Sequence, residues 1–484
     1  MEVRNLEPKA LWNHFADLNA VPRPSKKEER VIQFMIDFGK SLNLTTSTDA
    51  IGNVIIKKNA TEGMEGRKTL ILQSHLDMVH QKNEATVFNF DEQGIEMLVE
   101  QDWVKANGTT LGADNGIGVA AIMALLSSTT IAHPALEAMF TIDEETGMTG
   151  AKELDGSNFS GEILLNLDTE DDDELSIGCA GGLDTNTLYR YSSEAIVLNS
   201  LVYEVSVKGL LGGHSGMDIH LGRGNANKLL NRFLNSLVDK IDFQLVEFDG
   251  GSLRNAIPRE AKAIVAVKSI DDVKLAQYFS AFSKMLIEEF KVVEPNLAMM
   301  LSPTSTASLA VSKNDTLKII NSIYAVQNGV FRMSPSIYGL VEASSSFARV
   351  IVKNGEYITQ SLQRSSVESS KEDVASTIKA IFMAIGAEVV QSGDYPGWSP
   401  DPNSEILTIM AKLYQEMYHE KPQIKACHAG LECGILGKHL PGVEMISFGP
   451  NIRGAHSPDE KVQISSVQKF WDYLLATIAK TPVK

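Results

Sequence analysis

Apolar and polar residues follow two patterns along the first part of the chain, and these predict both helices and strands. Residues 31–42 carry apolar side chains at the spacing of one helical face, which predicts a helix. The runs NVIIKK over 53–58 and TLILQSHLD over 69–77 are typical of buried strands. LGADNGIGVAAIMALLSS over 111–128 predicts a Gly-rich turn that opens a helix. Strands that alternate with helices indicate an α/β layer.

Other apolar runs also end in polar residues. ALEAMFTIDEETG over 135–147 and EILLNLDTEDDDE over 162–174 both end in acids. The tail returns to alternating helices and strands and includes VEMISFGPNIRGAHSPDE over 443–460. These segments extend the predicted α/β layer.

The middle of the chain has a different pattern. YEVSVKG over 203–209 and AIVAVKS over 263–269 alternate as half-exposed strands do. Residues 225–241 and 274–290 predict amphipathic helices. This pattern is typical of an α+β domain with helices on one face of its sheet.

The domain boundaries follow from these changes of pattern. SGDYPGWSPDPNS over 392–404 is rich in Gly, Pro, Ser and Asp and predicts a linker. We therefore predict an α/β domain formed by residues 1–186 and 391–484. An α+β domain, residues 187–390, is inserted into it.

Composition narrows the class of protein. The 484 residues are 43% hydrophobic and 22% charged, which suits two or three globular domains. The net charge of −17 disfavours binding to nucleic acid or to anionic membranes. Three scattered cysteines, Cys179, Cys427 and Cys433, are not a disulfide framework and favour a reducing compartment. We find no signal peptide or membrane span and expect a cytoplasmic protein.

Potential metal ligands stand at the ends of four apolar runs. They are His75 with Asp77, the acids that follow Ile142, Asp168, and His456 after a Gly-rich loop. Ligand sites of α/β sheets form beyond the carboxyl ends of the strands, so residues far apart in sequence can meet there.

Each residue has a chemical interpretation. His75 can bind a metal through one imidazole nitrogen, while Asp77 holds the other nitrogen. Asp114, at the expected helix start, could bridge two cations with one carboxylate. Of the neighbours Glu144 and Glu145, one can bind metal while the other takes a proton from the metal-bound water.

The formal charges balance in such a site. Asp114, Glu145, Asp168 and one hydroxide would offset the four positive charges of two divalent ions. Taken singly, each residue is more often a turn, a cap or a packed side chain. Their order and ligand types together favour a metal site.

The motifs SHLDMV, GADNGIGVA, DEETG, NLD, GGHSG and GAHSPDE resemble the di-zinc metallopeptidase family that includes carboxypeptidase G and the carnosinases. The resemblance spans nearly the whole chain. Five longer strings resemble the aminoacyl-histidine (Xaa-His) dipeptidase branch of that family: DMVHQKN, TLGADNGIG, GGHSGMDIHLGRGNANKLL, GGSLRNAIPREA and HAGLECGIL.

The resemblance implies a role for each matched residue. One metal would be held by His75, Asp114 and Asp168, and the other by Asp114, Glu145 and His456. Glu144 would be the general base, with Asp77 orienting His75. The metals would be two divalent cations per subunit, zinc first, with cobalt or manganese as alternatives.

Residues of the inserted domain would contact the substrate. The resemblance implies that His214 stabilises the oxyanion and that Arg364 binds the terminal carboxylate of the substrate. Asn255 would also contact substrate. For His428 and Glu432, a purely structural role and a role in supporting the site both stay open.

The resemblance also implies a fold and an activity. The fold is a zinc-peptidase catalytic domain, a mixed sheet flanked by helices, interrupted by an inserted lid domain, with a cis peptide at Asp114-Asn115. The activity is hydrolysis of dipeptides, Xaa-His dipeptides included, by a metal-bridging hydroxide as the lid closes. The alternatives are a deacylase acting on N-acyl amino acids and a non-catalytic binding protein. We expect a homodimer acting on small peptides, with a monomer left open.

Overall fold

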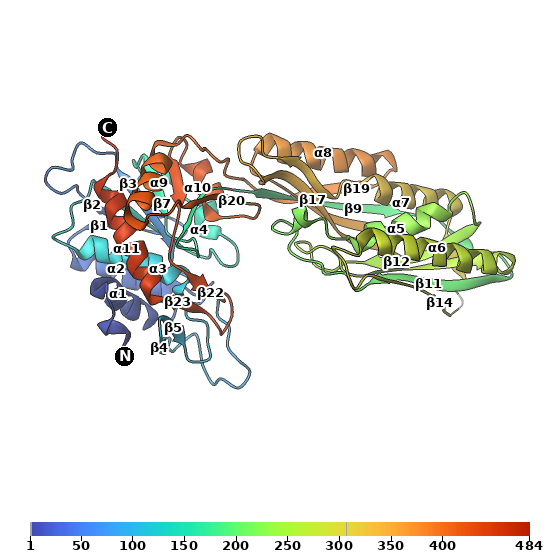
Figure 1. Cartoon of the computed structure of the whole chain (residues 1–484), viewed down its shortest axis with the longest axis horizontal. Helices are drawn as coiled ribbons and strands as arrows, with labels where there is room; N and C mark the ends of the chain where they lie inside the picture. The colour runs from blue at the N-terminus through green and yellow to red at the C-terminus, as the bar shows by residue number, and fades with distance from the viewer. Residues whose placement is uncertain (1, 306) are drawn as a thin grey trace. The chain divides into compact units, whose positions relative to one another are not determined.

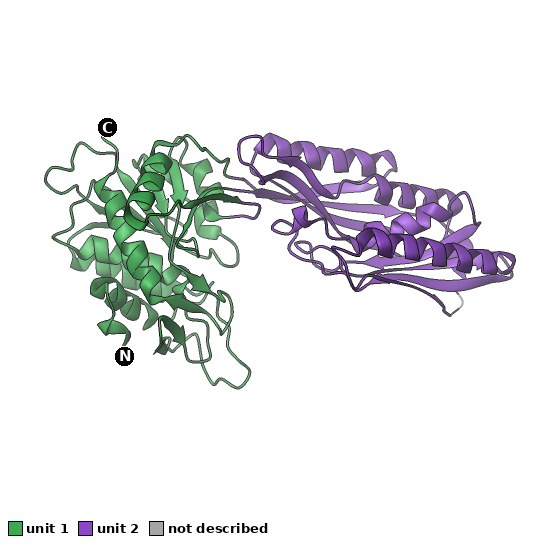
Figure 2. Ribbon diagram, viewed as in Figure 1, with its two compact units in different colours: residues 1–178, 398–426, 431–484 green, residues 179–397, 427–430 purple. Residues whose placement is uncertain are grey.

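The computed structural model describes residues 2–305 and 307–484, which form two compact units (Figure 2). Unit 1 comprises Met1–Gly178, Trp398–Ala426 and Leu431–Lys484, and unit 2 comprises Cys179–Gly397 and Cys427–Gly430. The sequence pattern predicts crossings after residues 186 and 390, whereas the units divide after 178 and 397. The short return at 427–430 has no counterpart in the prediction.

Unit 1 is built on an eight-stranded mixed sheet (Figure 1). Its strands, in spatial order, are β1 (Thr45–Thr48), β2 (Val54–Lys58), β6 (Leu136–Thr141), β3 (Leu70–His75), β7 (Ile163–Asn166), β21 (Glu444–Ser447), β8 (Glu174–Cys179) and β20 (Gln423–Cys427). β6, β3, β7 and β21 are parallel to one another. β3, β6 and β7 are buried throughout, which is why they appear in the sequence as continuous apolar runs.

Helices pack on this sheet. They are α1 (Lys9–Asn19), α2 (Glu29–Ser41), α3 (Ala113–Ser127), α4 (Thr149–Lys152), α9 (Glu405–Tyr418), α10 (Glu432–His439) and α11 (Ile464–Ala479), with short 3₁₀ turns at Val3–Asn5 and Gly156–Asn158. α3 packs on β3 and on α1, and α9 packs on β21 and α11. α3 is apolar on all sides because it is buried nearly throughout.

A second, four-stranded sheet completes unit 1. Its order is β22 (Ile452–Arg453), β23 (Lys461–Gln463), β5 (Trp103–Ala106) and β4 (Met97–Glu100). The loop between β22 and β23 carries His456. This sheet therefore ties the C-terminal loop to the segment that precedes α3.

Unit 2 is built on a nine-stranded sheet (Figure 1). Its main order is β14 (Ala298–Pro303), β11 (Ser200–Lys208), β13 (Ala261–Lys268), β12 (Phe243–Gly250), β17 (Val341–Lys353), β18 (Glu356–Ser365), β9 (Gly181–Arg190) and β19 (Glu388–Tyr395), with β16 (Gly329–Met333) paired to β17. β10 (Ser193–Ala195) and β15 (Leu309–Val311) form a separate pair. All of these strands pair antiparallel to their neighbours.

Four helices cover one face of this sheet, as the sequence predicts. They are α5 (Ala226–Leu237), α6 (Asp272–Phe290), α7 (Lys313–Ala325) and α8 (Glu368–Ala384), with 3₁₀ turns at Ile219–Leu221 and Ser269–Asp271. Val205 and Val207 of β11 belong to the core beneath the helices, whereas Glu204 and Ser206 line a hollow on the other face. The strict alternation in β11 thus marks a sheet that buries one face.

The predicted strands and helices are present, with one difference. The segment predicted as a linker over 392–404 is partly strand, because β19 continues to Tyr395. β19 is an edge strand whose side chains are mostly exposed, and its register on β9 shifts between Ser392 and Tyr395. Such a strand carries no apolar alternation for the sequence to reveal. Within the described residues, no helix is long and apolar enough to span a lipid bilayer.

Candidate metal centre

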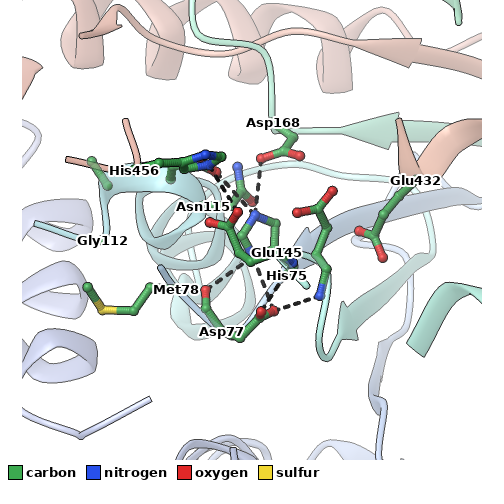
Figure 3. Close-up of polar contacts among 12 residues, drawn as sticks. His75, Asp77, Met78, Gly112, Asn115, Glu145, Asp168, Glu432 and His456 are labelled. Carbon is green, nitrogen blue, oxygen red and sulfur yellow. Dashed lines mark hydrogen bonds and ion pairs between the residues drawn. The ribbon is translucent and has the colours of Figure 1, made fainter. Parts of the chain in front are cut away.

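The carboxyl ends of the four parallel strands meet at one edge of the unit 1 sheet, and the predicted ligands gather there (Figure 3). His75 is the last residue of β3 and is only 1% exposed. Its Nε2 lies 3.1 Å from Oδ1 of Asp114 and 3.5 Å from Oδ1 of Asp168. β3, the start of α3 and the turn after β7 therefore converge on one point.

A second histidine reaches the same carboxylate from the C-terminal loop. Nε2 of His456 lies 3.3 Å from Oδ2 of Asp114 and 3.0 Å from Oε2 of Glu145. Asp114 thus directs one oxygen to each histidine. Its peptide bond to Asn115 is cis, as the sequence resemblance implied.

The side chains present suit divalent cations. Ligand atoms of His75, Asp114 and Glu145 all lie within 4.8 Å of one another. Oε1 of Glu145 and Oδ1 of Asp168 are buried without a hydrogen-bond partner among the described residues. Buried carboxylate oxygens without donors are costly, and a cation would satisfy them. Imidazole and carboxylate ligands fit zinc, cobalt and manganese alike.

Asp77 connects the histidine to the acidic turn. Its carbonyl oxygen lies 3.1 Å and its carboxylate 3.5 Å from Nδ1 of His75. The same carboxylate accepts the backbone N–H groups of Glu144 at 3.0 Å and Glu145 at 3.3 Å. It also accepts the hydroxyl of Ser25 at 2.8 Å. Asp77 therefore fixes both the imidazole and the turn that carries the two glutamates.

The pKa shifts within the cluster indicate an excess of negative charge. Hydrogen bonds to Asp114 and Glu145 raise the pKa of His456 to about 11. Burial raises the pKa of Asp168 to about 6, and the charges of Asp114 and Glu145 add to this shift. Both groups hold protons more tightly than usual. A bound cation would replace those protons in neutralising the site.

Glu144 occupies an unusual environment beside the ligands. Burial raises the pKa of its carboxyl group well above the usual value, and the charges of Asp168, Glu432 and Glu145 act in the same direction. The preceding residue, Asp143, has a positive φ of 55° and is held by Lys26, Thr146 and Thr149. The turn thus presents a carboxyl group with raised proton affinity next to the predicted metal ligands.

Glu432 begins α10 and is 2% exposed. Its Oε2 accepts Nε2–H of Gln73 at 2.7 Å and the hydroxyl of Thr141 at 2.9 Å. Oε1 is buried without a hydrogen-bond partner among the described residues. Burial raises its pKa to about 7. Glu432 therefore supports the ends of β3 and β6, beneath the ligand cluster.

The predicted substrate residues belong to unit 2. His214 lies in the loop after β11, and its Nδ1 accepts N–H groups from Gly216 at 3.2 Å and Met217 at 3.0 Å. Burial lowers its pKa, and the charge of Arg364 lowers it further. The neutral ring therefore carries its proton on Nε2 and can donate a hydrogen bond there.

The other predicted residues of unit 2 lie near His214. Arg364 of β18 is 5% exposed and donates to the hydroxyl of Tyr395 at 2.8 Å. Asn255 is exposed, and its carbonyl accepts the N–H of Ser215 at 2.8 Å. Nε2 of His428 lies 2.7 Å from the hydroxyl of Ser344.

Two residues of the site have no place in the sequence prediction. Glu460 accepts backbone N–H groups of the segment that carries Asp114, and Arg23 donates to a carbonyl of that segment. Glu460 follows His456 by four residues inside the quoted motif GAHSPDE, which was its only signal. Arg23 lies between α1 and α2 without any motif.

Comparisons with known proteins agree with this geometry. The chain matches peptidase family M20/M25/M40 over residues 71–480. It is 40% identical over 486 aligned residues to cytosol non-specific dipeptidase from Escherichia coli K12, with 100% of each chain covered. The crystal structure of aminoacylhistidine dipeptidase from Vibrio alginolyticus matches with a TM-score of 0.97 and 42% identity, covering 100% of this chain and 99% of that one. An aminopeptidase from Bacillus cereus shares the fold, with a TM-score of 0.56, 15% identity and 98% of each chain covered.

Proposed function

Since this chain belongs to peptidase family M20/M25/M40, we propose that it hydrolyses dipeptides, including those that end in histidine. Two full-length relatives are named as dipeptidases, and one of them as an aminoacylhistidine dipeptidase. The observation that carries the proposal is the carboxylate of Asp114, which reaches two histidines, while the buried Glu144 lies close to His75 and Asp168.

Two sets of side chains would hold the cations. We assign His75, Asp114 and Asp168 to one cation and Asp114, Glu145 and His456 to the other. Bound divalent cations, zinc first, would polarise the scissile carbonyl and increase the acidity of water. The charge excess described above supports two cations rather than one.

Glu144 is the proposed general base and acid. It is buried beside the proposed ligands His75 and Asp168, and bound cations would favour its ionised form, which could take a proton from the attacking water and return it to the leaving amine. Asp77 positions this residue through the backbone N–H of Glu144. Asp77 therefore orients both the proposed base, Glu144, and the proposed ligand, His75.

Unit 2 supplies the donors for the substrate. His214 would donate from Nε2 to the oxyanion of the tetrahedral intermediate, because Nδ1 already accepts two N–H groups. Arg364 would bind the terminal carboxylate, and Asn255 would contact the substrate. A carboxylate gripped one residue beyond the scissile bond favours dipeptides over longer chains.

One comparison of substrates separates this function from that of a deacylase with the same chemistry. We expect alanyl-histidine to be hydrolysed at least ~100-fold faster than acetyl-histidine. Acetyl-histidine lacks the free amino group, so the groups of a dipeptidase site that hydrogen-bond this amine would be left unpaired. Faster cleavage of acetyl-histidine would favour the deacylase.

A second experiment separates an enzyme from a binding protein. Chelation should abolish hydrolysis of alanyl-histidine, and added zinc should restore it. Glu144→Ala should lower kcat by ~10²–10⁴-fold with the metal content retained. Full activity of Glu144→Ala would show that the base is another residue.

Assembly and location complete the proposal. We expect a homodimer in the cytosol, the compartment named for the Escherichia coli relative. Analytical ultracentrifugation of the purified chain measures the assembly directly.

A further inference from the structure

Two buried charged side chains, Arg23 and Glu460, contact the backbone around Asp114, yet neither belongs to the proposed ligands or catalytic groups. Arg23 is 1% exposed and Glu460 is 2% exposed. Burying a charge is costly unless it is paired and hydrogen-bonded, so the contacts of these residues indicate what the burial achieves.

Glu460 binds four consecutive backbone N–H groups. Its Oε2 accepts from Leu111 at 2.7 Å and Gly112 at 2.9 Å. Its Oε1 accepts from Ala113 at 2.8 Å and Asp114 at 3.2 Å. These N–H groups lie just before and at the assigned start of α3, where Asp114 and Asn115 still have non-helical backbone angles. All of them precede or belong to the residue that faces both histidines.

Arg23 joins the same segment to the end of β3. Its Nη2 donates to the carbonyl of Gly112 at 2.5 Å. Its Nη1 donates to the carbonyls of Leu76 at 3.0 Å and Asp77 at 3.1 Å, directly after His75. The planar guanidinium therefore links the backbone that carries His75 to the backbone that carries Asp114.

Glycines leave the space that this link requires. A Cβ at Gly112 would lie 2.5 Å from Nη2 of Arg23, and a Cβ at Gly116 would lie 2.7 Å from the same atom. Gly112 also has a positive φ of 71°. The glycines of the motif GADNG thus leave room for the guanidinium of Arg23 next to the backbone that carries Asp114.

We propose that Glu460 and Arg23 are positioning residues that set the bridging geometry of Asp114 before a cation arrives. Glu460 follows His456 by four residues, so its carboxylate ties the loop of one ligand to the backbone of another. The cation assigned to Asp114, Glu145 and His456 depends on that tie most directly. Within the described residues, neither His75 nor Asp168 forms a hydrogen bond or ion pair with Glu460.

This inference rests on the proposed pair of cations, and its test reads metal affinity rather than activity. Glu460→Gln keeps the shape of the side chain but turns an NH₂ group toward N–H donors. Titration calorimetry with Zn²⁺ on the metal-free protein should show one of the two equivalents bound ~10–100-fold more weakly, the range typical of residues that orient metal ligands. The other equivalent should change by less than about threefold.

Glu137 offers a matched control in the same unit. It is also a buried carboxylate on backbone donors, accepting the N–H groups of Ser160 and Gly161 at 2.9 Å each. It stands at the start of β6, whereas the acidic turn follows the end of that strand. Glu137→Gln should therefore lower the thermal stability of the metal-free protein without weakening either equivalent of Zn²⁺.

Each outcome decides the inference. Wild-type affinity in Glu460→Gln, or an equal loss in Glu137→Gln, would overturn it. If Glu460→Gln yields no folded protein, Arg23→Lys takes its place, because a lysine cannot bridge three carbonyls, and unchanged Zn²⁺ binding there would also overturn it. If the wild-type protein itself binds no pair of cations, the proposed function fails instead.

Discussion

The two units hold their functional side chains in opposite ways. Unit 1 gathers its residues from the ends of several strands and surrounds them with buried negative charge. Unit 2 presents His214 from a single loop in which the ring accepts backbone N–H groups and stays neutral. The anionic cluster of unit 1 suits the proposed cations, whereas the neutral donor of unit 2 suits the proposed oxyanion.

The units nevertheless share one device. In each unit, a buried glutamate accepts backbone N–H groups of the segment that carries a proposed functional residue. In unit 1 it is Glu460 on residues 111–114, and in unit 2 it is Glu294 on Leu211 at 2.7 Å and Gly224 at 2.8 Å. Similar supports therefore serve different chemistry, so substituting Glu460 should change metal binding, whereas substituting Glu294 should not.

The largest loss of activity is expected when a carboxylate of the anionic cluster is removed. Asp114→Asn removes one negative charge and one of the two oxygens that would bind the proposed cations. We expect kcat/KM for alanyl-histidine to fall by at least ~10³-fold, because metal catalysis supplies several kcal/mol. Steady-state kinetics and metal analysis of the purified variant check this. Exposed Asp155, which caps a 3₁₀ turn, provides a control, and Asp155→Asn should retain full activity.

Removing the neutral donor of unit 2 should have the next largest effect. His214→Ala should lower kcat by ~10²–10³-fold, the usual loss for one oxyanion donor. Zinc stoichiometry should stay at the wild-type value, because unit 2 contributes no proposed ligand. A loss of bound metal in His214→Ala would erase the distinction between the units.

The cluster of unit 1 was predictable for a physical reason. Three of its proposed ligands, His75, Glu145 and Asp168, follow buried parallel strands, which the sequence marks as apolar runs, and parallel strands bring their carboxyl ends to one edge. Arg23 and Glu460 were not predictable in this way. Their partners are backbone groups of a distant segment, and backbone groups leave no pattern of side chains.

Unit 2 shows a second limit of the same kind. The alternation of β11 predicts which of its sides faces the core, but the composition of residues 392–395, at the end of β19, predicts a linker. An exposed edge strand that contains Gly393 has the composition of a loop. The pairing of β19 with β9 is a tertiary contact that local propensity does not encode.

Acid should destabilise the fold of unit 2, because its buried neutral histidine, His428, resists protonation. Burial lowers the pKa of His428 to about 3, and the charge of Arg364 adds to this shift. Between the unfolded value near 6.5 and about 3, the unfolded chain binds a proton that the folded chain does not, so stability falls as pH falls. The slope is about 1.4 kcal/mol per pH unit.

His428→Gln removes this titratable group while its amide can still hydrogen-bond the hydroxyl of Ser344. Urea unfolding should therefore show the wild type losing about 2 kcal/mol more than the variant between pH 6.5 and pH 5. His80→Gln, on the exposed surface of unit 1, serves as the control and should follow the wild-type curve. Parallel curves for wild type and His428→Gln would contradict the prediction.

The smallest effect comes from the glutamate that supports the loop of His214. Glu294 is 1% exposed, and Glu294→Gln leaves one carbonyl oxygen for two N–H donors. We expect about 1–2 kcal/mol less stability in urea, the cost of a buried donor left unsatisfied. kcat should fall by no more than ~10-fold, because Asp218 still accepts the N–H of His214. Zn²⁺ affinity should remain at the wild-type value, in contrast to Glu460→Gln. Weaker Zn²⁺ binding in Glu294→Gln would mean that the two glutamates act through general stability, because only one of them lies beside a proposed ligand.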